Sequence, residues 1–226
     1  MPVAIKNSPV SVAGFAFTLL GAILFSTKAI IVKKAFAETR VDPITLLTLR
    51  MIFSLPFFIG IAFFASGKKD NVRLTTRQWL LVIVTGLLGY YFSSLFDFIG
   101  LKYISAGLER LILFLYPTFT VIINAGFFRQ KISRIQWTAL ALTYTGIAIA
   151  YAGELHMDAG NPNFLLGSLL IFFCAITYSM YIVGSGRLIP VVGAAKFTAY
   201  AMLASTAGIF LHFLFAGNYM LLSSGR

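Results

Sequence analysis

The fold of this chain is decided by long apolar stretches, and residues 12–32 are a clear example: VAGFAFTLLGAILFSTKAIIV. Lys28 is the single charged residue within that stretch. About 20 apolar residues, each rising about 1.5 Å along a helix, cross a hydrocarbon core of about 30 Å. Because that core offers backbone polar groups no water, the stretch is predicted to be a membrane-spanning helix.

Six further stretches of this kind follow, separated by short polar loops. The expected spans are residues 12–32, 44–65, 79–99, 104–128, 135–152, 164–183 and 194–216. A hydrophobic share of 59%, a charged share of 11% and a mean hydropathy of +0.89 are outside the range of a soluble domain. The predicted fold class is therefore all-α, a polytopic membrane helix bundle of about seven spans with the lipid bilayer as its surroundings.

The net charge of +11 arises mostly from loops beside the apolar stretches. Lys and Arg in such loops mark the cytoplasmic side, and no basic stripe is left over for a nucleic acid. A cytoplasmic N-terminus places most of them inside: Lys6, Lys68, Lys69, Arg73, Arg77, Arg129, Lys131, Arg134, Arg187 and Lys196, against Lys33, Lys34, Arg40 and Lys102 outside. We therefore expect a multi-pass protein of the cytoplasmic membrane with its N-terminus inside and no nucleic-acid partner.

Residues suited to catalysis or metal binding are sparse. Cys174 is the single cysteine, so no intrachain disulfide can form, and His156 and His212 have no metal-ligand spacing. An intramembrane lipid-modifying enzyme would need a nucleophile beside its acid–base groups, and the one suitable cluster, His156 with Asp158, has none. We expect no metal, no cofactor and no enzymatic activity.

An internal repeat is visible in the spans. The small and apolar residues from Gly14 to Ser26 match those from Gly167 to Ser179 at a constant offset. Five spans separate the two copies, and an odd number turns the second copy upside down relative to the first. Inverted repeats of this kind are typical of secondary transporters, with the substrate site between the halves.

The repeat divides the chain into two units of unequal length. Residues 1–154 would form a first five-helix unit, and residues 155–226 the first two helices of a second. A complete second unit would bring the total to ten helices. We therefore expect this chain to be a fragment or a truncated product, and a natively short form would need a homodimer to complete its cavity.

Several motifs resemble a known family. Residues 100–106, GLKYISA, and 115–120, LYPTFT, resemble the fourth helix of EamA-type transporters in the drug/metabolite transporter superfamily. The basic loop 129–133, RQKIS, is similar to their next connection, although many members have an acid where this chain has Arg129 and Gln130. Arg50 resembles an arginine that these proteins often have in the second helix.

The resemblance implies ten helices in two inverted units and transport without nucleotide hydrolysis. The sequence has no Gly-x4-Gly-Lys-Ser/Thr phosphate loop, which agrees with that implication. Members of the family move amino acids, other metabolites, drugs and sugar phosphates. The expected function is therefore a secondary transporter of a small organic metabolite by alternating access; the alternatives are a non-transporting fragment or subunit and, less favoured, a lipid-modifying enzyme.

Charged residues within spans are the first candidates for the transport pathway, because each costs about 2.5–3.5 kcal/mol on insertion scales. Asp97 is expected to pair with Arg50 or Arg110, and Glu109 to face a different partner from its neighbour Arg110. Such a network could bind substrate or couple protons, with a static structural pairing as the alternative. Lys28 could attract a substrate anion. The alternative, which we favour, is that its long side chain extends to the lipid headgroups.

A proline and three tyrosines are candidates for the cavity lining or a hinge. Pro117 removes a backbone donor in the middle of the fourth span and should bend it next to Tyr116. Tyr91 and Tyr178 could stack on an aromatic substrate. The alternatives are a passive packing kink for Pro117, and core or lipid-facing positions for the aromatic rings.

Overall fold

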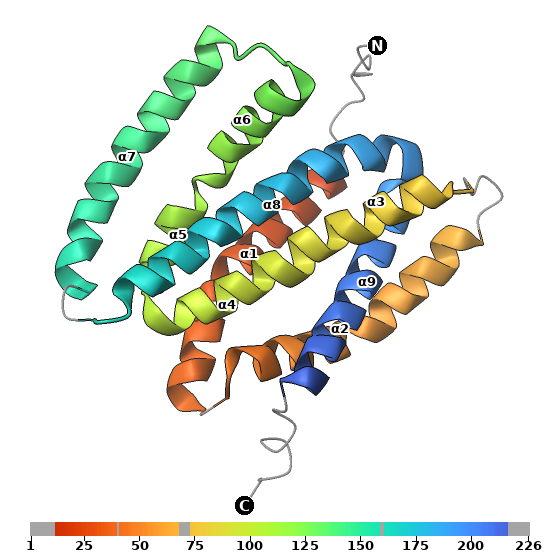
Figure 1. Ribbon diagram of the computed structural model, residues 1–226, viewed down its shortest axis with the longest axis horizontal. Coiled ribbons are helices and arrows are strands. Elements are labelled where there is room, and N and C mark those ends of the chain that lie inside the picture. Colours follow the sequence, from red (N-terminus) through yellow and green to blue (C-terminus); the bar gives the residue numbers. More distant parts are fainter. Residues whose placement is uncertain (1–11, 40, 68–72, 159–160, 217–226) are drawn as a thin grey trace, which may run out of the picture.

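The structure, a computed structural model, describes residues 12–39, 41–67, 73–158 and 161–216, apart from the side chains of residues 150 and 153–158. Within these ranges all regular structure is helical, which confirms the predicted fold class (Figure 1). The elements are α1 (Val12–Glu38), α2 (Pro43–Ser66), α3 (Thr76–Gly86), η1 (Leu87–Phe92), α4 (Ser93–Tyr103), α5 (Ala106–Leu113), α6 (Tyr116–Phe128), α7 (Arg134–Asp158), α8 (Phe164–Val192) and α9 (Ala194–Phe215).

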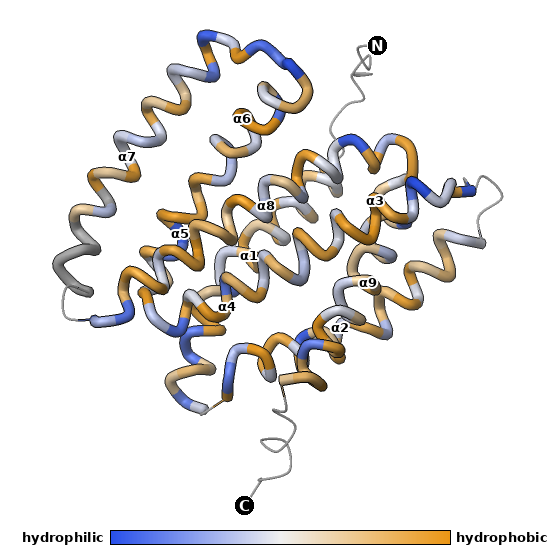
Figure 2. The backbone as a smooth tube through the Cα atoms, viewed as in Figure 1, coloured by the Kyte–Doolittle hydropathy of each residue, from blue (hydrophilic) through white to orange (hydrophobic). Residues whose placement is uncertain are grey.

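Six spans in the described residues are long and apolar enough to cross a membrane. They are α1, α2, the run α3–η1–α4, the run α5–α6, α8 and α9. Figure 2 shows apolar residues along these helices and hydrophilic residues mainly near their ends. The helix α7 contains the predicted fifth span, but polar residues such as Gln136 and Thr143 make it less apolar, and it is not among the six. Its crossing of the membrane stays a prediction.

Local sequence signals set several helix ends. The carboxylate of Asp42 accepts hydrogen bonds from the first amides of α2, and Pro43 begins that helix. Thr75 and Gln78 form a capping box at the start of α3. Gly193, at a φ of 86°, ends α8 and allows the sharp reversal into α9.

Two span boundaries differ from the sequence prediction. The helix α1 continues beyond residue 32 to Glu38, because Lys33 and Lys34 are good helix formers outside the apolar stretch. The helix α8 continues beyond residue 183 to Val192, so Pro190 lies inside its last turn and not in the following loop. Flanking polar residues end an apolar stretch without ending the helix.

The most extensive helix contacts join α2 with α9 and α4 with α8. Close approach is possible because glycines lie at the crossings: Gly100 faces Ile171, and Gly167 faces Tyr103 and Ile104. The α5–α6–α7 segment extends away from these helices along one side of α8 (Figure 1). The resulting bundle has a closely packed part and a looser flank.

Two spans contain irregular turns beside the packed part. The third span contains the π-helical turn η1, a rare element that is frequent at functional sites. The fourth span breaks at Phe114 and Leu115, between α5 and α6, immediately before the Tyr116–Pro117 pair. The predicted bend at Pro117 is therefore present.

Candidate functional site

A cavity of about 260 Å³ lies where α1, α2, η1, α4 and α8 meet. Its wall combines charged and aromatic side chains, among them Lys28, Arg50, Tyr90, Asp97, Tyr178 and Tyr181. Pockets for small ligands usually have a mainly apolar wall with a few placed polar groups. This cavity has that composition and contains three of the five predicted charged residues.

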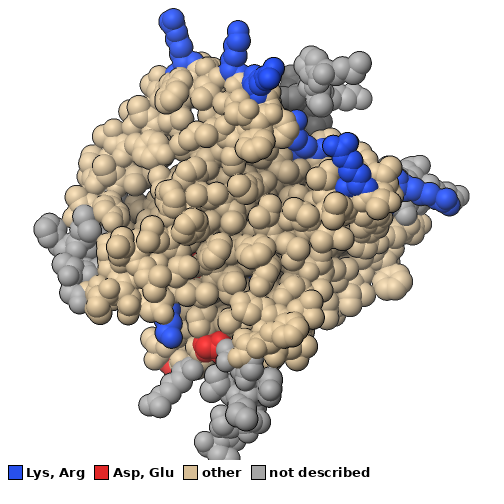
Figure 3. All heavy atoms as spheres, in the orientation of Figure 1, with Lys and Arg blue, Asp and Glu red and all other residues tan. Residues whose placement is uncertain are grey.

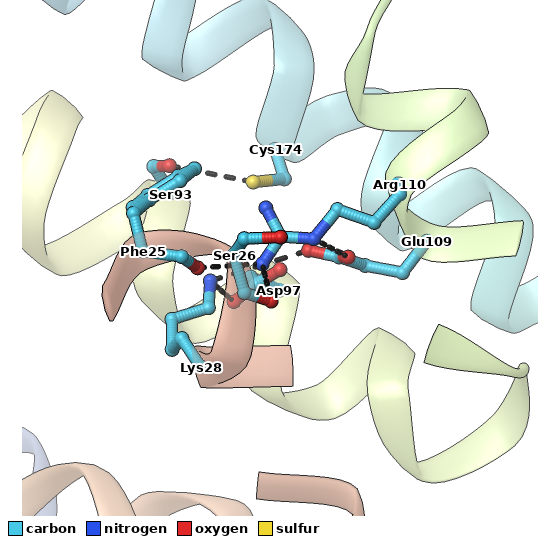
Figure 4. A network of polar contacts seen from close by, with 8 residues as sticks. All are labelled: Phe25, Ser26, Lys28, Ser93, Asp97, Glu109, Arg110 and Cys174. Carbon is cyan, nitrogen blue, oxygen red and sulfur yellow. Dashed lines mark hydrogen bonds and ion pairs between the residues drawn. The ribbon is translucent and has the colours of Figure 1, made fainter. Parts of the chain in front are cut away.

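Lys28 and Asp97 form the central ion pair of the site (Figure 4). The Nζ atom of Lys28 donates to Oδ2 of Asp97 at 2.5 Å, and Oε1 of Glu109 lies 4.0 Å from the same nitrogen. The side chains of Asp97 and Glu109 are 2% and 0% exposed, whereas that of Lys28 is 24% exposed. One lysine of α1 thus faces two buried carboxylates, one from α4 and one from α5.

Arg110 completes this charge cluster from the other side. Its Nε atom lies 3.2 Å from Oε2 of Glu109, and its Nη2 atom donates to the carbonyl oxygens of Phe25 and Ser26 at 2.7 and 3.1 Å. These contacts tie α5 to α1, as the sticks in Figure 4 show. The guanidinium of Arg110 is therefore committed to one carboxylate and two backbone carbonyls.

Arg50 reaches the same cavity from the second turn of α2. Its guanidinium lies over the Phe98 ring, 5.7 Å from the ring centroid, and is attracted by the charge of Asp97. Within the described part of the chain, Arg50 makes no hydrogen bond or ion pair at bonding distance. Its hydrogen-bond donors therefore have no protein acceptor there.

Three carboxylate oxygens in the cluster lack a hydrogen-bond partner among the described residues: Oδ1 of Asp97 and both oxygens of Glu109. A buried acceptor left unbonded costs about 1–3 kcal/mol. The ion pairs with Lys28 and Arg110 offset part of this cost through charge attraction. The cluster is thus electrically paired but not saturated with hydrogen bonds, which leaves room for a change of partners.

A group of tyrosines forms the aromatic wall. The hydroxyls of Tyr90 and Tyr181 are hydrogen-bonded at 2.7 Å, and Tyr181 stacks on Tyr178 with ring centroids 5.8 Å apart. The ring of Tyr116 packs edge-on against Tyr178 at 5.3 Å. The group joins η1, α6 and α8, three elements that are distant in the sequence.

The predicted tyrosine Tyr91 is not part of this wall. Its hydroxyl hydrogen-bonds Nδ1 of His212 at 2.9 Å, on the side of η1 that faces α9. Its neighbour Tyr90 lines the cavity instead. Tyr178 lines the cavity, and the ring of Tyr116 packs against Tyr178 from α6.

The predicted charge pairs need correction, although all five charged residues belong to the cluster or the cavity. Asp97 pairs with Lys28, not with Arg50 or Arg110, so Lys28 is inside the cluster and does not reach for the headgroups. Glu109 and Arg110 contact each other directly, because the long Arg110 side chain can bend back to its neighbour. Helical angles alone do not fix where flexible side chains end.

Sequence reasoning missed other residues of the wall. Tyr90, Ser93 and Ser94 line the cavity together with the predicted Asp97, and their spacings of three and four residues place them on one helical face. That pattern was a usable signal. The thiol of Cys174, within 3.3 Å of the Ser93 hydroxyl, gave none, since a buried cysteine is common in any core.

The described residues contain no cluster of His, Cys, Asp and Glu able to hold a metal ion. The side chains of His156 and Asp158, the one pair considered for catalysis, lie outside the described part. Within that part, the chemistry of the site consists of charge pairing, hydrogen bonding and aromatic packing.

Comparison with known proteins identifies relatives among transporters. The chain is 30% identical to the uncharacterized transporter YcbK of Bacillus subtilis over 202 residues, which are 88% of this chain and 63% of YcbK. It is 25% identical to the uncharacterized transporter YdfC of the same bacterium over 126 residues, 55% of this chain and 40% of YdfC. The chain thus spans less than two thirds of the length of either relative.

No solved structure matches the chain. The family model of the EamA-like transporter family matches residues 12–152, which include α1 to α6 and most of α7. The matched range contains all five charged residues of the site, from Lys28 to Arg110. The chain belongs to the EamA-like transporter family.

Proposed function

We propose that the protein is a secondary transporter that moves a small organic metabolite by alternating access, with the cavity at the charge cluster as its substrate site. The proposal rests mainly on one observation: the cavity, the buried charge cluster and the π-helical turn η1 lie next to one another. Ionisable groups inside a membrane bundle typically mark substrate or proton pathways. The family and both relatives support the coarser part, transport.

The charge cluster supplies an element that can change partners. Lys28 lies between two acids, at 2.5 Å from Asp97 and 4.0 Å from Glu109. Protonation of either carboxyl, or arrival of a charged substrate, would shift Lys28 toward the other. Because these residues belong to α1, α4 and α5, the shift would alter how those helices are held together. Glu109 is our candidate for proton coupling, since it is fully buried and faces both Lys28 and Arg110.

The orientation in the membrane is part of the proposal. The connections α2–α3, α6–α7 and α8–α9 lie at one end of the bundle, and most described Lys and Arg side chains gather along that edge (Figure 3). Arg73, Arg77, Arg129, Lys131 and Arg134 belong to these connections or the adjoining helix turns. The positive-inside rule would place this end in the cytoplasm. The N-terminus would then also be cytoplasmic.

Proton coupling is tested by Glu109→Gln in proteoliposomes that contain a pH-sensitive dye. A panel of amino acids and aromatic acids is added outside, and the dye reports any proton movement that accompanies uptake. We expect the wild-type protein to respond to at least one compound and Glu109→Gln to lose the response to the pH gradient. The matched control is Glu38→Gln, because Glu38 forms only an exposed pair with Lys34.

Each result discriminates between the two roles of the cluster. An unchanged dependence on the pH gradient in Glu109→Gln would assign Glu109 to static pairing. A wild-type protein that moves none of the panel, with or without a gradient, would contradict transport of those metabolites by this chain.

A further inference from the structure

We propose that the cavity recognises an organic monoanion, a carboxylate attached to an aromatic body, with Arg50 as the group that binds the carboxylate. This inference rests on the proposed transport function and names its substrate class. It draws on three features of the site: the balance of charges, the free donors of Arg50 and the tyrosine wall.

The five charged residues of the site do not cancel. Lys28, Arg50 and Arg110 are three cations, whereas Asp97 and Glu109 are two carboxylates. With every group ionised, the site has one positive charge in excess. An uncompensated charge within a membrane span is costly, and a bound monoanion would neutralise it. A cationic ligand would instead add a second unbalanced charge.

Among the three cations of the site, Arg50 is the one whose N–H donors bond no acceptor in the described residues. Lys28 is held by Asp97, and Arg110 by Glu109 and two backbone carbonyls. Arg50 lies on the Phe98 ring, which supports its planar group without using its N–H donors. A guanidinium presents a planar fork that matches a carboxylate through two parallel hydrogen bonds. The geometry therefore leaves the carboxylate-binding edge of Arg50 available.

An amine is a poor match for the same place. Oδ1 of Asp97 has no hydrogen-bond partner in the described ranges of the chain and would attract an ammonium group. However, Lys28 already bonds Oδ2 of the same carboxylate, and the positive charge of Arg50 is attracted to it as well. Two cations already share this one carboxylate, so a third would be repelled.

The rest of the wall suits an aromatic body. Tyr178 and Tyr181 are stacked with their ring planes 24° apart, and Phe25 lines the cavity with them. Aromatic rings pack well against one another in offset or edge-on arrangements. The cavity, at about 260 Å³, is slightly smaller than the usual ligand pocket of about 300–1,000 Å³. One ring with a short acidic side chain is the size of compound that this favours.

The experiment uses three probes with one ring and different charges: phenylacetate, 2-phenylethanol and 2-phenylethylamine. Binding of radiolabelled phenylacetate to the full chain in lipid nanodiscs is measured by equilibrium dialysis, and the other two compounds are added as competitors. We expect unlabelled phenylacetate to displace the label, and the alcohol and the amine to displace at least about tenfold less well. A lost hydrogen-bonded charge pair accounts for a difference of that size.

Variants assign the effect to Arg50. Arg50→Gln is expected to bind phenylacetate at least about tenfold more weakly, and Arg50→Lys to bind with intermediate affinity, because lysine keeps the charge but loses the fork. Arg187→Gln is the matched control: Arg187 stacks on Phe128, is exposed and does not line the cavity. Its affinity should equal that of the wild type. Gel filtration and thermal unfolding of each variant check that it is folded; where Arg50→Gln is not, Arg50→Lys provides the test.

The inference would be overturned if the wild type did not bind phenylacetate, or if the amine or the alcohol bound as well as phenylacetate or better. It would also be overturned if Arg50→Gln bound phenylacetate as tightly as the wild type. Where Arg50→Gln does not fold, wild-type affinity in a folded Arg50→Lys would overturn it. None of these binding results contradicts the proposed transport function if the protein in proteoliposomes still moves another compound. Failure of the proposed function is seen separately, as binding of phenylacetate without movement of any compound across the membrane.

Discussion

The two flanks of this bundle differ in how closely their helices approach one another. On one side, α8 and α9 pack against α2 and the α3–η1–α4 run, and buried residues occur along the length of α8 and α9. On the other side, α6 has no buried residue, and α7 lies apart (Figure 1). Glycines with a neighbouring helix at contact distance, such as Gly86, Gly89 and Gly184, lie on the packed side, although Gly60 and Gly186 there have open space, as Gly126 and Gly146 do on the other side.

The difference shows where a membrane bundle gains its stability. Lipid tails are as apolar as leucine, so close packing and polar contacts between helices must hold the structure together. The packed flank has both; on the open flank such contacts are concentrated between α6 and α8, where Ser179 donates to the Tyr116 carbonyl oxygen and Phe119 packs on Phe172. The charge cluster lies at the boundary, where α4 of the packed part meets α1 and α5. A helix arrangement that changes during transport would use this boundary.

The largest expected effect concerns the charge cluster. Asp97→Asn leaves Lys28 facing Glu109 as its remaining acid, at 4.0 Å. Removing one partner of a buried ion pair typically costs about 3–5 kcal/mol. We expect a loss in that range in the free energy of unfolding, measured by SDS titration in mixed micelles. An unchanged midpoint would mean that the pair does not hold the boundary together.

Two controls sharpen this test. Glu38→Gln breaks an ion pair whose side chains are 71% and 64% exposed, and it should change the free energy by no more than about 1 kcal/mol. Combining Asp97→Asn with Lys28→Met should recover part of the loss, because no unpaired lysine remains. A double variant as unstable as the single one would assign the loss to packing.

The second prediction compares two glycines on opposite flanks. A Cβ on Gly86 would lie 2.6 Å from the carbonyl oxygen of Ala201, a backbone atom that cannot turn aside. Gly86→Ala should therefore cost about 1–3 kcal/mol in the SDS titration. Gly146→Ala places its methyl group in open space in α7 and should be neutral or stabilising, by up to about 1 kcal/mol. Equal effects in the two variants would refute the division into packed and open flanks.

Sequence reasoning predicted the spans well and their interior contacts less well. The seven apolar stretches are helical over most of their length, because hydrocarbon length and backbone hydrogen bonding leave little choice, and the main interruption is at Phe114 and Leu115. Helix ends such as Glu38 and Val192 depend on the residues that follow the apolar stretch, which hydropathy alone does not describe. The bend at Pro117 was predictable, since a proline removes a donor wherever it stands.

The charged residues of the candidate site were predictable as a set but not as pairs. Lys28 comes from α1 and Asp97 from α4, and only the packing of those helices brings them to 2.5 Å. Tyr90 lines the cavity and Tyr91 does not; the spacing of Tyr90 from Ser93, Ser94 and Asp97 was the sequence signal that could have decided between them.

A third prediction compares the turns at the end of each flank. Gly193, between α8 and α9, has a φ of 86°, and Arg129, between α6 and α7, has a φ of 52°. A side chain in the left-handed region costs roughly 1–2 kcal/mol. Gly193→Ala should therefore destabilise by about that amount, and Arg129→Gly should stabilise, both measured by SDS titration. Shifts in the same direction for both variants would contradict this reading of the two turns.

The smallest expected effect tests whether the tyrosine wall is held by its hydrogen bond. Tyr90→Phe removes the hydroxyl that bonds Tyr181 at 2.7 Å and keeps the ring contact at 5.0 Å. Side-chain hydrogen bonds between membrane helices contribute about 0.6 kcal/mol on average, so we expect a loss of that order in the SDS titration. The control is Tyr144→Phe on the exposed surface of α7, which should have no effect. Equal midpoints for the two variants would mean that ring packing alone holds the wall, and that the cavity could then widen without breaking a bond.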